Sequence, residues 1–260
     1  MTDNPLDFSA KVTLVTGGAR GVGRGISLRF MERGSQVVIC GRNAPDAPIA
    51  ANGLEAAFIA ADVRDAAQVD ALMAEIKSRY GRLDVVVNNA GGAPPADPST
   101  VSPRFSESII RLNLVAPLFV SQAANKIMQE QETGGSIVNI ASVTVVRPAP
   151  WTAAYGAAKA GLINLTHAHA LAWAPKVRVN GIIAGLIRTE QSHLHYGDEE
   201  GIKRVAATIP LGRMADPSDI GDACIFLSSS LARFVTGAAL AVDGGGELPA
   251  FLDAASGEKH

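Results

Sequence analysis

A tyrosine and a lysine stand four residues apart in the stretch YGAAK, from Tyr155 to Lys159. The apolar pattern predicts a helix over residues 153–173, and residues four apart in a helix lie on the same face. A free phenol has a pKa of about 10, but a neighbouring ammonium group favours the phenolate. Ser142, thirteen residues before Tyr155, could donate a hydrogen bond to a substrate oxygen. These side chains indicate acid–base chemistry at a hydroxyl or carbonyl group.

A glycine-rich turn separates the first predicted strand, 11–16, from the first predicted helix, 23–33, and residues 16–23 read TGGARGVG. Gly17, Gly21 and Gly23 would allow a tight turn, a close approach of the backbone to a pyrophosphate, and a close helix–strand contact. The start of the helix offers free N–H groups to phosphate. The turn therefore predicts a dinucleotide site, where a nicotinamide would exchange a hydride with the substrate while Tyr155 takes or gives the proton.

Short apolar runs alternate with longer helical patterns along the chain. Strands are predicted at 11–16, 36–40, 57–61, 84–87, 136–141, 177–184 and 240–242, and the main helices at 23–33, 65–79, 106–129 and 153–173. Near-continuous apolar strands that alternate with helices favour a parallel sheet covered on both faces. Between the second and third strands, Pro45 and Pro48 disfavour a helix, so we expect an irregular crossover there.

Composition narrows the class of protein. The 260 residues are 47% hydrophobic and 18% charged, which excludes a charge-dominated disordered chain and favours one dinucleotide-binding and catalytic domain over residues 1–260. A net charge of −2 argues against nucleic acid as a partner. There are only two cysteines, no signal-peptide pattern and no apolar stretch of the ~18 residues that a membrane span needs. We therefore expect a cytoplasmic protein with no membrane partner.

The TGxxxGxG spacing resembles the glycine motif of the short-chain dehydrogenase/reductase family, and further segments agree in order. They are NNAG at 88–91, RLNL at 111–114, Ser142, YGAAK at 155–159, PLGR at 210–213 and VDGG at 242–245. The resemblance covers about residues 10–245. It implies a Rossmann-like, doubly wound α/β fold with seven parallel strands in the order 3-2-1-4-5-6-7 and helices on both faces. It also implies an NAD(P)(H)-dependent oxidoreductase that interconverts a carbonyl and a secondary alcohol.

The same resemblance assigns the functional residues. The implied catalytic residues are Asn113, Ser142, Tyr155 and Lys159, with Asn113 holding a water that links Lys159 to solvent. The implied cofactor-binding residues are Gly17, Arg20, Gly21, Val22, Gly23, Gly41, Arg42, Asp62, Val63, Asn89, Ala90, Gly91, Tyr155, Lys159, Gly185, Ile187 and Thr189. Asp62 and Val63 would lie along the adenine, and Thr189 would contact the carboxamide of the nicotinamide. The family usually has proline where this chain has Ala184, which loosens the expected geometry there.

The end of the second strand bears on the choice of dinucleotide. Members that prefer NAD(H) usually carry an acidic residue there, which binds the ribose hydroxyls and repels a 2′-phosphate. Here Gly41 takes that position, Arg42 follows at once, and Arg20 can approach from the glycine turn. A guanidinium group matches a phosphate with a planar fork of donors. The pattern predicts NADP(H) as the preferred cofactor with NAD(H) possible, since Asp46 could swing in.

The substrate is not identified by the sequence beyond a small-molecule carbonyl or alcohol. Segments 92–95, 143–151 and 186–196 should border the pocket, with a substrate lid at about 186–210. These segments are mostly apolar, with Arg147, His193 and His195 as candidate polar contacts. The histidines show no metal-ligand spacing, so we expect no metal site.

Two other functions stay open from the sequence. One is a 3-oxoacyl-thioester reductase that acts on acyl carrier protein or coenzyme A substrates, and the other is a non-catalytic dinucleotide sensor. The family resemblance also implies a homotetramer, with the helices at 153–173 and 106–129 pairing across a twofold axis. Small residues on the first of these helices, namely Ala157, Ala158, Ala160 and Gly161, would permit close approach of a partner helix.

Overall fold

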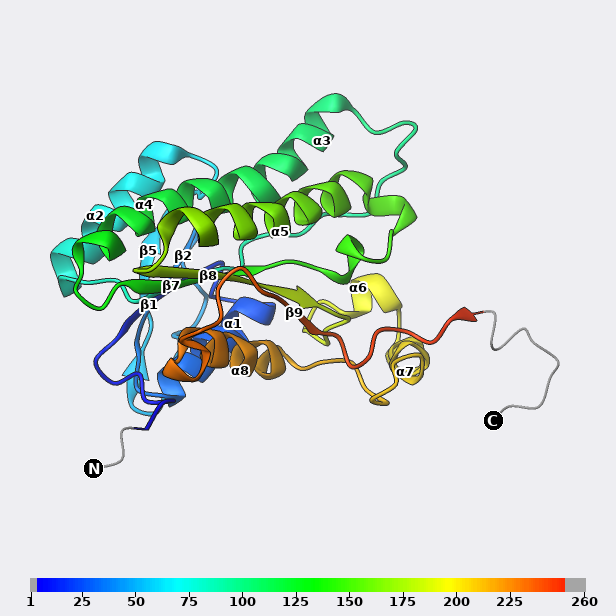
Figure 1. The fold of residues 1–260 in the computed structure, drawn as a ribbon. Helices are drawn as coiled ribbons and strands as arrows, with labels where there is room; N and C mark the ends of the chain where they lie inside the picture. The colour runs from blue at the N-terminus through cyan, green and yellow to red at the C-terminus, as the bar shows by residue number, and fades with distance from the viewer. Residues whose placement is uncertain (1–3, 251–260) are drawn as a thin grey trace.

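The computed structural model describes residues 4–250. Its main sheet has seven parallel strands in the order β5-β2-β1-β6-β7-β8-β9, which confirms the predicted order 3-2-1-4-5-6-7 (Figure 1). The strands are β1 (Val12–Thr16), β2 (Gln36–Gly41), β5 (Ala57–Ala60), β6 (Val85–Asn88), β7 (Gly135–Ile140), β8 (Val177–Ala184) and β9 (Ala239–Val242). The central strands are buried on both faces, which accounts for their continuous apolar runs.

Helices cover both faces of the sheet, as predicted (Figure 1). One layer holds α2 (Ala66–Tyr80), α4 (Ala116–Glu130) and α5 (Ala153–Trp173), and the other holds α1 (Gly21–Glu32) and α8 (Pro217–Ser228). A Cβ atom at Gly25 would lie 2.3 Å from Cβ of Pro217, so only glycine lets α1 and α8 pack this closely. Within residues 4–250, no helix is long and apolar enough to cross a membrane.

The helix predicted at 106–129 begins earlier and is not uniform. It comprises α3 (Pro103–Ile110), a π-helical turn η1 (Arg111–Val115) and then α4. Ser102 caps its start by accepting a hydrogen bond from the Phe105 N–H, and Pro103 occupies the first helical position, where its missing N–H costs nothing. π-turns occur often at functional sites, and this one carries Asn113.

The crossover between β2 and β5 has no helix, in agreement with the prediction, but it contains a hairpin that the sequence pattern did not predict. Strands β3 (Ala50–Ala51) and β4 (Leu54–Glu55) pair in antiparallel fashion. The turn residues Asn52 and Gly53 both have positive φ, at 52° and 73°, as a two-residue hairpin turn requires. The Asn-Gly pair was the available signal.

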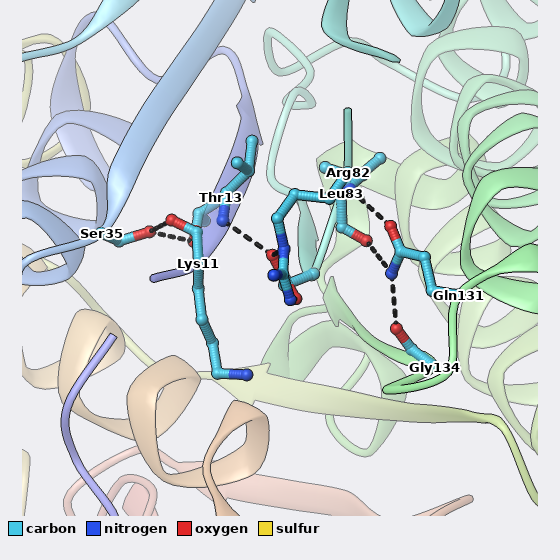
Figure 2. Close-up of polar contacts among 9 residues, drawn as sticks. Lys11, Thr13, Ser35, Arg82, Leu83, Gln131 and Gly134 are labelled. Atoms are coloured by element: carbon cyan, nitrogen blue, oxygen red, sulfur yellow. Dashed lines mark hydrogen bonds and ion pairs between the residues drawn. The ribbon is translucent and has the colours of Figure 1, made fainter. Parts of the chain in front are cut away.

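Polar side chains form hydrogen bonds along the amino-terminal edge of the sheet, which is at the opposite end of the strands from the glycine turn (Figure 2). The Gln131 amide accepts from the Leu83 N–H at 2.8 Å and donates to the Leu83 carbonyl at 3.1 Å. The buried carboxylate of Asp84 accepts from the Val12 N–H at 2.9 Å and from the Arg82 guanidinium. These polar groups therefore bind one another and not a ligand. Ligands of open α/β sheets bind at the opposite, carboxyl edge.

Candidate active site and dinucleotide cleft

The carboxyl ends of β1 and β6 are joined through one threonine and one asparagine. The Thr16 hydroxyl accepts from the backbone N–H groups of Asn89 and Ala90, both at 3.0 Å. The Asn89 amide donates in return to the carbonyls of Thr16 at 2.9 Å and Gly17 at 3.3 Å. The glycine turn and the NNAG segment, predicted from distant parts of the sequence, are thus held side by side.

The glycine turn is shaped for the close approach of a ligand. Gly17 and Gly21 have positive φ, at 63° and 51°. A Cβ atom at Gly23 would lie 2.2 Å from the Gly17 carbonyl oxygen, so α1 can begin directly against the turn only because Gly23 has no side chain. Arg20 is the N-cap residue of α1 and its side chain makes no capping bond, so the N–H groups of Val22 and Gly23 have no hydrogen-bond partner among residues 4–250 and could bind an anion.

A carboxylate reaches this helix start from a distant segment. Oε1 of Glu190 accepts from the Gly21 N–H at 2.9 Å, and the Cγ2 atom of Thr189 would be 3.8 Å from a Cβ at Gly21. Thr189 therefore lies beside the glycine turn. Glu190 was not among the predicted site residues, although it is adjacent to Thr189 in the sequence.

The backbone before Thr189 is held in place without the usual proline. Ala184 is the last residue of β8 and pairs with Val242 of β9, and the Gly185 N–H donates to the Val242 carbonyl at 3.0 Å. A Cβ at Gly185 would lie 2.6 Å from Cα of Asp243, so this close contact requires glycine. Ile187 then forms a bridge with Ala215. The sheet thus positions the segment that proline would otherwise restrict.

Tyr155, Lys159 and Ser142 meet at the carboxyl end of β7. The Lys159 ammonium lies 5.6 Å from the centroid of the Tyr155 ring and donates to the Ile140 carbonyl at 2.7 Å. Burial raises the pKa of Tyr155, and a hydrogen bond with the Ser142 side chain lowers it. Burial lowers the pKa of Lys159 to about 8. The helical spacing and the strand end therefore bring the three predicted side chains together.

Asn113 lies on the π-helical turn η1, close to Lys159 of this cluster. Its Oδ1 accepts from the Gly92 N–H at 2.9 Å, and its Nδ2 donates to the carbonyls of Gly92 and Ile109, both at 2.9 Å. A Cβ at Gly91 would lie 2.7 Å from Oδ1 of Asn113 and 3.2 Å from Nζ of Lys159, so only glycine lets both side chains approach the backbone here. Asn113 therefore fixes the loop after β6 next to Lys159.

The expected ribose end of the cleft carries positive charge. Gly41 ends β2, and the exposed Arg42 forms no ion pair within residues 4–250. The Arg64 guanidinium binds the Asp62 carboxylate, with Nη2 2.6 Å from Oδ2, and holds its pKa below the ordinary value, with a smaller contribution from the charge of Arg42. Arg64 was not predicted as a site residue, and only its position two residues after Asp62 could have indicated it. Val63 is buried beside this pair.

Two of the side chains that were predicted as polar substrate contacts bind other groups of the protein. Arg147 forms an ion pair with Glu247 at 2.5 Å, and Nδ1 of His193 lies 3.0 Å from the Glu190 carbonyl oxygen. The ring of His195 lies against Tyr196. Residues 4–250 contain no group of three or more histidine, cysteine, aspartate or glutamate side chains placed to hold a metal ion.

Comparison with known proteins gives one consistent result. A family model described as enoyl-(acyl carrier protein) reductase matches residues 17–247. A 3α-hydroxysteroid dehydrogenase of Mediterraneibacter gnavus is 36% identical over 242 residues, which cover 90% of this chain and 96% of that protein. An L-rhamnose 1-dehydrogenase (NAD(P)(+)) of Azotobacter vinelandii is 34% identical over 246 residues, with 90% and 96% covered. The ligand-free aldohexose dehydrogenase of Thermoplasma acidophilum has a TM-score of 0.85 at 32% identity, with 92% and 94% covered.

The sheet, the glycine turn and the buried tyrosine–lysine pair, together with these matches, define the class: NAD(P)-linked oxidoreductases that act on alcohol or carbonyl groups of small molecules. Within that class, the chain belongs to the short-chain dehydrogenase/reductase family. The resemblance found in the sequence motifs is confirmed.

Proposed function

We propose that the protein interconverts a carbonyl and a secondary alcohol by hydride transfer, with Tyr155 as the acid–base group. The observation that carries this proposal is the buried cluster of Tyr155, Lys159 and Ser142 at the carboxyl edge, beside the glycine turn. A hydroxyl, a phenol and an ammonium in one shielded site suit proton transfer to or from a substrate oxygen.

The residues at the cleft fit a nicotinamide dinucleotide. The start of α1 has no side-chain cap from Arg20, and Gly17 packs closely on the NNAG segment, since a Cβ there would lie 3.3 Å from both Cα of Ala90 and Nδ2 of Asn89. Gly17, Gly21, Val22 and Gly23 would hold the pyrophosphate, while Thr189 would bind the nicotinamide end. When bound, the cofactor supplies or accepts the hydride.

The protein's own groups divide the rest of the work. Ser142 donates a hydrogen bond to the substrate oxygen, which fixes the reacting carbon. Tyr155 gives its proton to that oxygen during reduction and takes it back during oxidation. Lys159 stabilises the phenolate through its charge, and its bond to the Ile140 carbonyl keeps the ammonium in place. Asn113 holds the Gly92 loop and, in this proposal, orders the water that connects Lys159 with solvent.

NADP(H) is the cofactor that the charges at the ribose end favour. The carboxylate of Asp62 is bound by Arg64, whereas Arg42 and Arg20 are exposed and free of ion pairs within residues 4–250. Two charge-assisted contacts to a 2′-phosphate, at ~1.5–3 kcal/mol each, would favour NADPH over NADH at least tenfold.

The double variant Gly41→Asp/Arg42→Leu tests this preference, because it places a carboxylate at the strand end and removes the guanidinium. We expect the ratio of kcat/KM for NADPH to that for NADH to fall by at least about tenfold. Arg24→Leu, on the solvent side of α1, controls for the loss of one exposed guanidinium. Equal or better use of NADH by the wild type would contradict the assignment.

Residues 186–210 form the proposed substrate lid. They include α6 (His193–Tyr196) and α7 (Glu199–Ala207), and Ile202 and Ile209 pack with Met214 in a small apolar cluster separate from the main core. Such a small cluster can move as a unit while the sheet stays fixed.

We also propose that the protein forms a homotetramer.

A panel of ketones, secondary alcohols, steroid alcohols and sugars, followed at the NAD(P)H absorbance band, tests the reaction itself. We expect cofactor-dependent turnover of a carbonyl or secondary alcohol, and Ser142→Ala should lower it by about 10²-fold or more. Dinucleotide binding without turnover of any member of the panel would instead support a sensor.

A further inference from the structure

A cavity opens beside the catalytic tyrosine, between the loop after β6, the start of α3 and the 3₁₀ turn η3 (Pro150–Thr152). It is open to solvent, and the space inside it and in its mouth amounts to about 450 Å³. The lining residues are Ala93, Pro94, Ala96, Pro98, Val101, Phe105, Ser106, Ile109, Trp151, Thr152, Ala153, Ala154 and Tyr155.

The lining contains no charged side chain. Its polar side-chain groups are three hydroxyls and the indole N–H of Trp151, and the Thr152 hydroxyl already donates to the Ala149 carbonyl at 3.3 Å. Phe105 and Ile109 lie one helical turn apart on α3, so both face the same side, and Ile109 is 6% exposed. The walls therefore present apolar surface toward Tyr155.

Both sides of the cavity are held in place. The Ala96 N–H donates to the Trp151 carbonyl at 2.9 Å, which joins the loop after β6 to η3. The indole of Trp151 is 58% exposed, so a large apolar surface stands at the rim with little of it covered by the chain itself. A ligand that reaches Tyr155 through this cavity would cover the indole.

We propose that this cavity binds the non-reacting body of the substrate, and that this body is apolar, with Phe105 and Trp151 as the residues that determine specificity. The inference rests on the proposed reaction at Tyr155. A sugar carries a hydroxyl on nearly every carbon, and each hydroxyl buried here without a partner opposes binding. An alkyl or carbocyclic body loses nothing on desolvation and gains the apolar contact.

The test compares three secondary alcohols that share a six-membered ring: cyclohexanol, 4-propylcyclohexanol and inositol. With NADP+ and wild-type protein, we expect 4-propylcyclohexanol to have at least a tenfold higher kcat/KM than inositol. Phe105→Asn should reduce the advantage of 4-propylcyclohexanol over cyclohexanol by about tenfold, because it puts an amide in the apolar wall. Phe105→Leu, which keeps the wall apolar, should retain most of that advantage, and circular dichroism checks that both variants fold.

Inositol or free sugars turned over as well as the alkylated ring would overturn the inference while leaving the proposed reaction intact. An unchanged substrate ratio in Phe105→Asn would also overturn it. Failure of every alcohol and ketone, sugars and steroids included, would instead overturn the proposed function on which it rests.

Discussion

Lys159 is the residue whose surroundings constrain its chemistry most. Its side chain is 3% exposed, and it is anchored by the Ile140 carbonyl rather than by a carboxylate. Burial lowers its pKa from 10.5 to about 8. Burying the charged ammonium therefore lowers the free energy of unfolding. This loss of stability is consistent with a need for the charge beside Tyr155.

Lys159→Met should make the free protein more stable at pH 7 and abolish its catalysis. Between pH 8 and 10.5 the unfolded wild-type chain binds more protons at this residue than the folded one, so wild-type stability rises with pH there. The variant lacks this rise. We expect it to be more stable by about 1–3 kcal/mol at pH 7, with the gap closing by pH 10.5. Denaturant unfolding at pH 7, 8.5 and 10 measures this, and a gap independent of pH would contradict the burial of a charged lysine.

The spacing of side chains in the sequence was enough to assign some of the site residues but not others. Tyr155 and Lys159 could be paired because helix geometry alone puts them on one face. Arg64 and Glu190 could not be assigned, because their roles depend on which distant or neighbouring groups the fold brings within bonding distance. Asn113 was chosen by resemblance, and its three bonds to the Gly92 loop and α3 became visible only with the π-turn.

At the scale of elements, the segment after β8 touches the start of α1 through a single carboxylate. Glu190 bonds to the Gly21 N–H, at a helix end where a negative charge is stabilised. The same N–H group faces the expected pyrophosphate position. In the proposed binding mode the dinucleotide displaces this side chain, and we expect the displacement to couple cofactor binding to movement of residues 186–210.

Glu190→Gln should bind NADPH more tightly than the wild type. The amide is a weaker acceptor at the helix start and does not repel the pyrophosphate. A charge at a helix end is worth ~0.3–1 kcal/mol, so we expect the Kd to fall by about twofold to fivefold. Fluorescence titration measures it, with Glu200→Gln on exposed α7 as the control. A Kd that rises in Glu190→Gln would show that the carboxylate assists binding instead.

Elements were predicted well where a hydrophobic period was long and poorly where a local irregularity interrupted it. The strands and the helix at 153–173 follow their apolar patterns. The π-turn at 111–115 does not show in the apolar pattern. At this turn the Asn113 side chain binds the Ile109 carbonyl one turn earlier and the distant Gly92 backbone, and the second contact depends on the tertiary fold. The β3–β4 hairpin is too short for any period to show.

For the whole molecule, the apolar pattern predicted a parallel sheet, whereas the strand order came from the family resemblance, and the structure confirms both. The small residues on α5 proved to have different roles. Ala158 is buried within the chain, and a Cβ at Gly161 would lie 3.0 Å from Leu114 of the same chain, so neither is free for a partner. Ala157 and Ala160 are exposed, as is Leu171 at the far end of the helix.

The exposed apolar surface agrees with self-association. Leu171 is 85% exposed and Phe234 is fully exposed, so both are available for contact with another chain. We expect light scattering at micromolar concentration to give the mass of four chains, and Ala157→Glu/Ala160→Glu to lower it. A monomer mass for the wild type would contradict the homotetramer.

The central claim is that Tyr155 moves the proton while the cofactor exchanges a hydride. Tyr155→Phe removes the hydroxyl and keeps the ring that packs beside Lys159. Measured with the best substrate of the panel, its kcat should fall by at least ~10²–10⁴-fold, while the Kd for NADPH stays close to the wild-type value. Near-normal turnover in Tyr155→Phe, with the cofactor bound, would contradict the account.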